Sequence, residues 1–229
     1  MGSGYMIYYL LAGAMTLVGM FFSRRLKSKF NKYAQMGIQS GKSGEEVAHE
    51  MLRFYNVQGV KVVQGQGFLS DHYNPLTKTI SLSPDVFQGR SIAAAAVSAH
   101  ECGHAIQHDT SYSLLKMRST LVPAVKAASM AQGYLLMFAL MMAGTMPALM
   151  VIVIIAFGIT TLFSFVTLPV EFDASKRALV WLDQSGVTNE TEHEGAKDAL
   201  WWAAMTYVSA ALSSLVILLY LLLNFASND

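Results

Sequence analysis

Four apolar stretches of the chain are long enough to cross a lipid bilayer as helices. They cover residues 6–22, two parts of 127–168 separated by a break at 144–147, and about 200–225. A hydrocarbon core of about 30 Å is crossed by about 20 helical residues. The pattern therefore predicts a mainly α-helical membrane protein with four transmembrane helices.

The polar region between the first two spans contains shorter apolar runs, some with helical and some with alternating spacing. Helical spacing begins at "SGEEVAHEMLRFY", where Ser43 and Glu46 are spaced as a capping box. Residues 60–83 contain short β-branched or alternating runs separated by glycine or a turn, which predicts a small β-sheet or hairpin. A helix is then expected to open near "SPDVFQGRS" and to continue through "IAAAAVSAHECGHAIQH", because four consecutive alanines favour helix.

These patterns divide the chain into five predicted segments. They are a first transmembrane helix (1–24), a region containing the histidine-rich helix (25–120), a transmembrane helical hairpin (121–169), a second polar segment (170–199) and a fourth transmembrane helix (200–229). The three expected outer loops lack Lys and Arg, whereas basic residues such as Arg24 and Arg25 lie on the other side. The positive-inside rule then predicts an outer N-terminus and cytosolic polar segments.

Composition narrows the class of protein further. Only 14% of the 229 residues are charged, against about 25% in an average soluble domain, and 53% are hydrophobic. The net charge of +1 gives no indication of a nucleic-acid partner. Cys102 is the only cysteine, so an internal disulfide is excluded, and we expect this side chain to be a packing residue in a reducing compartment.

His100, Glu101 and His104 form the pattern H-E-x-x-H within the predicted helix. Residues four apart lie on one helical face, so both imidazoles can bind one zinc ion, and Glu101 can reach a water held at that ion. His108 lies on the same face, but donors at i, i+4 and i+8 span about 12 Å. Zinc–nitrogen bonds are about 2.0 to 2.1 Å, so we expect His108 to support the site or to lie at the surface.

Another segment must therefore supply the third ligand, and Glu171 in "LPVEFDASKRAL" is the candidate. After the histidine helix the chain is expected to cross the membrane out and back, which returns Glu171 to the same membrane face. The alternative is an ordinary charge at the start of a helix beside the membrane.

The H-E-x-x-H pattern, the predicted hairpin and "EFDAS" together resemble the membrane-embedded gluzincin metallopeptidases. In particular the chain is similar to the YugP-like neutral zinc metallopeptidases of bacteria, relatives of the HtpX and CAAX-processing proteases, and the similarity extends to "DHYNPLTKTISLSPDVF" and "AAMTYVSAAL". The resemblance implies Zn2+ as cofactor and Glu171 as third ligand. Related peptidases often carry Asp four residues after that Glu, where it orients a zinc-bound His. Here Ser175 occupies the position and Asp173 lies at plus two, so either could take this role.

In the expected mechanism Glu101 is the general base and a further group stabilises the oxyanion. Tyr207 is preferred for that role because it lies in a stretch covered by the resemblance, although an ordinary interfacial tyrosine is an equal alternative. His72, Tyr73, Arg177 and His193 are the other candidates. The strand-like "KTISLS" is either a sheet edge that receives an extended substrate or an internal strand.

The sequence thus predicts a zinc-dependent endopeptidase that is a multi-pass protein of the cell membrane, with its active site on the cytosolic side, and the expected location is a bacterial inner membrane. Its expected partners are lipid, membrane or unfolded protein substrates in quality control, and a regulatory membrane protein. The alternative is a catalytically inactive zinc-binding membrane scaffold, against which the presence of Glu101 argues. A transporter or channel is disfavoured because the predicted spans carry almost no ionisable residues at mid-depth.

Overall fold

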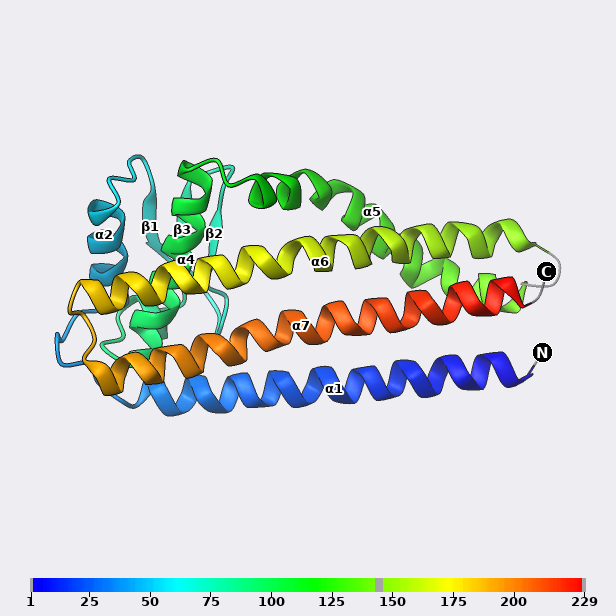
Figure 1. The fold of residues 1–229 in the computed structure, drawn as a ribbon, viewed down its shortest axis with the longest axis horizontal. Coiled ribbons are helices and arrows are strands. Elements are labelled where there is room, and N and C mark those ends of the chain that lie inside the picture. Colours follow the sequence, from blue (N-terminus) through cyan, green and yellow to red (C-terminus); the bar gives the residue numbers. More distant parts are fainter. Residues whose placement is uncertain (1, 143–145, 228–229) are drawn as a thin grey trace. The chain divides into compact units, whose positions relative to one another are not determined.

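The computed structural model describes residues 2–142 and 146–227, and most of them are helical, as predicted. In chain order, the elements are α1 (Gly2–Ala34), α2 (Gly44–Phe54), β1 (Lys61–Gln64), β2 (His72–Asn74), β3 (Thr79–Leu82), α3 (Pro84–Phe87), α4 (Ile92–Asp109), α5 (Ser113–Met141), α6 (Pro147–Gln184) and α7 (Glu190–Ala226) (Figure 1). The chain separates into two compact units. The apolar unit comprises Met1–Phe22, Met117–Leu168 and Thr206–Asp229, and the sheet unit comprises Ser23–Lys116 and Pro169–Met205.

Three helices in the described part of the chain are long and apolar enough to span a membrane. They are α1 from Met6 onward, α6 and α7. The second predicted span falls in α5, which is not among them, so the expectation of four transmembrane helices is not confirmed. Most of the predicted break at 144–147 lies outside the described residues, and α6 begins at Pro147.

The sheet unit contains a three-stranded sheet in the order β1-β3-β2. Strand β3 pairs in parallel with β1 and antiparallel with β2, so the "KTISLS" segment is the central strand. A central strand already has both neighbours, and the edge-strand alternative for this segment is therefore wrong. The small sheet itself was predicted, but the parallel pairing joins segments that are not adjacent in sequence.

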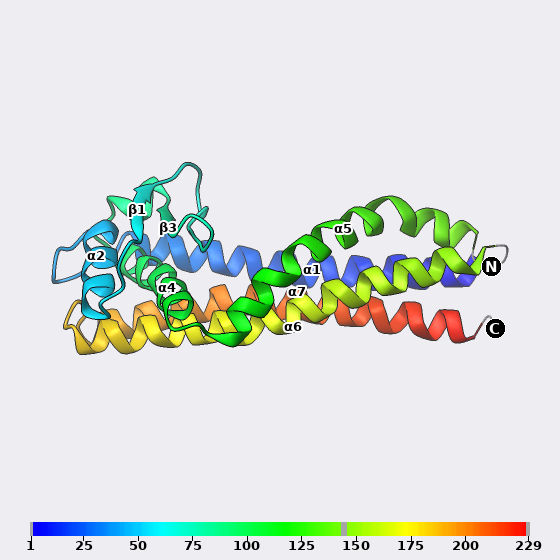
Figure 2. The same ribbon diagram turned by 90° about the horizontal axis from the view of Figure 1, so that it is seen from above.

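Helix α4 lies between the sheet and the C-terminal part of α6, as Figure 2 shows. Its alanines are almost completely buried, from Ala93 through Ala96 and again at Ala99. Small side chains allow close packing on several sides at once, and α4 contacts α2, α3 and two strands. The histidine-bearing helix is thus the centre of the sheet unit, which holds its side chains in fixed positions.

One predicted helix boundary is confirmed and another is wrong. Ser43 caps α2 as predicted, because its hydroxyl accepts from the Glu46 N–H and its own N–H donates to the Glu46 carboxylate at 2.6 Å. The single helix expected from "SPDVFQGRS" is instead two helices, α3 and α4. Ser91 accepts from the Ala94 N–H and so caps a new helix at Ile92.

Candidate metal centre

Three donor side chains converge between α4 and α6. The donor atoms of His100, His104 and Glu171 all lie within 4.8 Å of one another. The Nε2 atoms of His100 and His104 lie 3.3 and 3.5 Å from Oε2 of Glu171. Ligands of a tetrahedral zinc ion with bonds of about 2.0–2.1 Å are about 3.3–3.4 Å apart, so these separations fit zinc. Two imidazoles and a carboxylate are also ligands that zinc accepts.

The two helices can approach this closely because residue 103, between the two histidines, is glycine. A Cβ atom at Gly103 would lie 2.6 Å from the carbonyl oxygen and 3.0 Å from the Cα of Ala174 on α6. Any larger side chain would therefore push α6, and Glu171 with it, away from the histidines. Sequence analysis did not single out Gly103. A glycine inside an otherwise alanine-rich helix was the only indication of a close helix contact there.

Hydrogen bonds orient both imidazole rings. Nδ1 of His100 lies 3.1 Å from Oγ of Ser175, and Nδ1 of His104 lies 3.0 Å from Oε1 of Gln107. Of the two residues left open by the sequence, Ser175 is thus the one that contacts a histidine directly. Asp173 instead accepts hydrogen bonds from Gln107 at 2.8 Å and from Arg177 at 2.6 Å.

Gln107 is a second residue of the site that sequence analysis missed. Its side chain is completely buried and also donates to the carbonyl of Val170 at 2.8 Å. No local pattern indicates this role, because the partners on α6 lie more than sixty positions away.

Burial and neighbouring charges together set the pKa values of the site. Glu101 is only 7% exposed, and this burial raises the pKa of its carboxyl above the usual value, although the nearby His100 and His104 oppose the rise. Burial lowers the pKa of His104, but the hydrogen bond and charge of Glu171 outweigh it, so the pKa of His104 is raised. In the metal-free chain His104 therefore favours a proton, which binding of a metal ion would displace.

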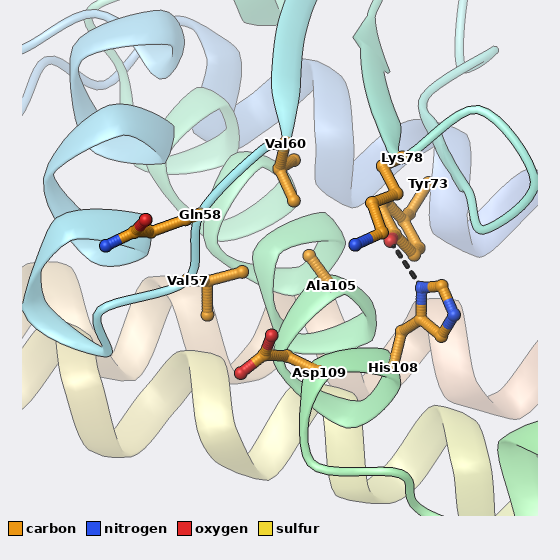
Figure 3. A pocket seen from close by; sticks show the side chains of 8 residues that line it. All are labelled: Val57, Gln58, Val60, Tyr73, Lys78, Ala105, His108 and Asp109. Carbon is orange, nitrogen blue, oxygen red and sulfur yellow. Dashed lines mark hydrogen bonds between the residues drawn. The ribbon is translucent and has the colours of Figure 1, made fainter.

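The remaining candidate residues are placed around this centre. His108 lies outside the donor cluster, and its Nδ1 is 2.7 Å from the hydroxyl of Tyr73 at a small pocket beside the end of α4 (Figure 3). His72 is exposed, with Nδ1 2.8 Å from the carbonyl of Ser70. Tyr207 belongs to the apolar unit. The oxyanion donor, including the alternatives Tyr73, Arg177 and His193, stays a prediction.

Comparisons with known proteins agree on one class. A family profile with the description "Putative neutral zinc metallopeptidase" matches residues 8–226. A relative from Bacillus subtilis (strain 168), named "Putative membrane protease YugP", is 39% identical over 204 residues, which cover 89% of this chain and 90% of that protein. No solved structure matches the chain.

Proposed function

The chain belongs to the neutral zinc metallopeptidase family, and on that basis we propose that it is a membrane-integral zinc endopeptidase. The resemblance read from H-E-x-x-H and "EFDAS" is confirmed at the level of the family. The observation that carries the proposal is the separation of 3.3 and 3.5 Å between the Nε2 atoms of His100 and His104 and the Glu171 carboxylate.

His100, His104 and Glu171 would hold the zinc ion. Among the described residues no fourth donor joins this cluster, so the three ligands would leave a position for water, as in catalytic zinc sites, whereas structural sites are closed by a fourth protein ligand. A bound zinc ion supplies Lewis acidity, which lowers the pKa of water to about 7 and polarises the scissile carbonyl.

Glu101 is the proposed general base. It is adjacent in sequence to one zinc ligand, and burial raises the pKa of its carboxyl above the usual range, which makes the carboxylate a better proton acceptor. It takes a proton from the attacking water and delivers it to the nitrogen of the leaving amine. A scaffold that held zinc only for structure would have no use for a carboxyl here.

The proposed place of action is the cytosolic face of a bacterial inner membrane. Support comes from the three apolar helices, from the name of the relative as a membrane protease, and from the basic residues that follow the first span. Proteins with exposed juxtamembrane or unfolded segments are the proposed substrates, as in membrane protein quality control.

The test is cleavage of an unfolded casein by the full chain in detergent, with Glu101→Gln beside the wild type. General-base catalysis contributes about 10²–10⁴-fold, so the variant should lose at least about a hundredfold in rate while it retains about one zinc per chain. Glu190→Gln, an exposed change in the first turn of α7, is the matched control and should cleave normally. Full activity in Glu101→Gln would show that the proposed mechanism is wrong.

A further inference from the structure

Gln107 makes three hydrogen bonds in an environment with no solvent access. Its Oε1 lies 3.0 Å from Nδ1 of His104, and its Nε2 donates to the carbonyl of Val170 and to Oδ2 of Asp173, both at 2.8 Å. The residue is 0% exposed. Both N–H groups of the amide and one lone pair of its oxygen are therefore used inside the protein.

The partners on α6 determine which way the amide faces. The Val170 carbonyl and the Asp173 carboxylate can only accept, so the NH2 group of Gln107 must point toward them. Its oxygen then faces His104, and Nδ1 of that ring must donate. In the neutral ring this leaves the lone pair on Nε2, the atom that lies 3.5 Å from Glu171. The amide thus selects the form of His104 that can bind a metal through Nε2.

The same amide also positions the third ligand. Val170 immediately precedes Glu171 in α6, and Asp173 follows it by two residues. Asp173 is in turn fixed by Arg177 at 2.6 Å. Gln107 therefore connects the ring of one ligand to the backbone and side chain on either side of another.

We infer that Gln107 is a positioning residue of the zinc site, which sets the tautomer of His104 and locks Glu171 in register with it. This inference rests on the proposed function, since it concerns the same metal centre. Ser175, also on α6, contacts Nδ1 of His100 directly at 3.1 Å. Helix α6 thus orients both imidazoles, one directly and one through Gln107.

The experiment compares the full-length wild type with Gln107→Met and Gln107→Glu. Met is unbranched and similar in volume, and the partners Val170 and Asp173 keep other hydrogen bonds, so the fold should persist. Gln107→Met should bind zinc about 10–100-fold more weakly in competition with a chelator. Glu retains an acceptor for Nδ1 of His104 but loses both donors to α6 and brings a second carboxylate to Asp173, so Gln107→Glu should also bind zinc about 10–100-fold more weakly while it keeps the Nδ1–H of His104 bonded. Gln184→Met, an exposed change at the end of α6, is the control.

A second readout separates positioning from general stability. In zinc-loaded protein labelled with 15N at its six histidines, the Nδ1–H of His104 should exchange slowly with water in the wild type and in Gln107→Glu. It should exchange rapidly in Gln107→Met, whose folding is checked by thermal denaturation without zinc.

The two readouts together decide the inference. Wild-type zinc affinity and a protected Nδ1–H in folded Gln107→Met would overturn it. If the Met variant failed to fold, Gln107→Glu would decide alone, and loss of the protected proton there would count against the inference. A wild-type chain that binds no zinc would instead overturn the proposed function, and the inference with it.

Discussion

Replacing Gly103 by alanine tests how the two ligand-bearing helices are held together. The added Cβ would lie 2.6 Å from the Ala174 carbonyl oxygen, whereas ordinary van der Waals contact begins at about 3.4 Å. The nearest atoms to the added Cβ, the carbonyl oxygen and the Cα of Ala174, belong to the backbone of α6, so no side chain can rotate to relieve the overlap. Helices α4 and α6 must therefore move apart by about 0.8 Å at this point.

The displacement should affect the site more than stability. Overpacking of this kind costs about 1–3 kcal/mol, while replacing Gly by Ala inside a helix gains about 0.8–1.0 kcal/mol. The net loss in the free energy of unfolding should therefore be about 0–2 kcal/mol. The Nε2–Oε2 separations, now 3.3 and 3.5 Å, would rise toward about 4 Å, beyond the spacing that zinc requires. A misplacement of about 1 Å in an active site costs about a hundredfold in rate.

The assay follows three quantities in the full chain: casein cleavage, zinc affinity in chelator competition and the thermal midpoint. Gly103→Ala should lose about a hundredfold in cleavage rate and bind zinc more weakly, with a modest change in the midpoint. Gly158→Ala in α6 is the matched control, because nothing lies within 4 Å of its added Cβ. Wild-type cleavage and zinc affinity in Gly103→Ala would refute the close helix contact as the basis of the site.

Three further changes test other parts of the account. Ser175→Ala should weaken zinc binding about 10–100-fold in chelator competition, because Nδ1 of His100 loses its partner, and unchanged affinity would argue against that role. His108→Ala should retain about one zinc per chain by elemental analysis, and loss of the metal would make it a ligand after all. Burial raises the pKa of Asp71 despite hydrogen bonds from Ser83, so the folded pKa exceeds the unfolded one. The unfolding free energy of the wild type should thus fall as pH rises through the folded pKa of Asp71, and Asp71→Asn should flatten this fall. The same pH dependence in wild type and variant would show that the pKa of Asp71 is not raised by folding.

Local patterns predicted the parts of the fold that depend on neighbouring residues. The capping box of Ser43 and Glu46 requires contact across only three positions, and the structure contains it. The pairing of β1 with β3 depends instead on packing between distant segments, so the sequence left the position of "KTISLS" in the sheet undecided. The α3–α4 break was missed although residues 88–91 interrupt the apolar spacing with a glycine and with Ser91, a residue type typical of a helix N-cap.

The candidate site divides in the same way. His100 and His104 were found because four-residue spacing on a helix defines a shared face. The choice between Asp173 and Ser175 could not be made, because they lie about 200° apart around a helix whose contact face is set by the fold. Gln107 was missed for a related reason. Its partners come from α6, and no local spacing indicates which buried amide will meet them.

Zinc K-edge X-ray absorption of the purified full-length chain tests the central claim most directly. The account predicts one zinc per chain with two imidazole ligands and oxygen ligands at about 2.0–2.2 Å, unchanged in Glu101→Gln. A sulfur ligand at about 2.3 Å, which only Cys102 or a methionine could supply, or a third imidazole would contradict it.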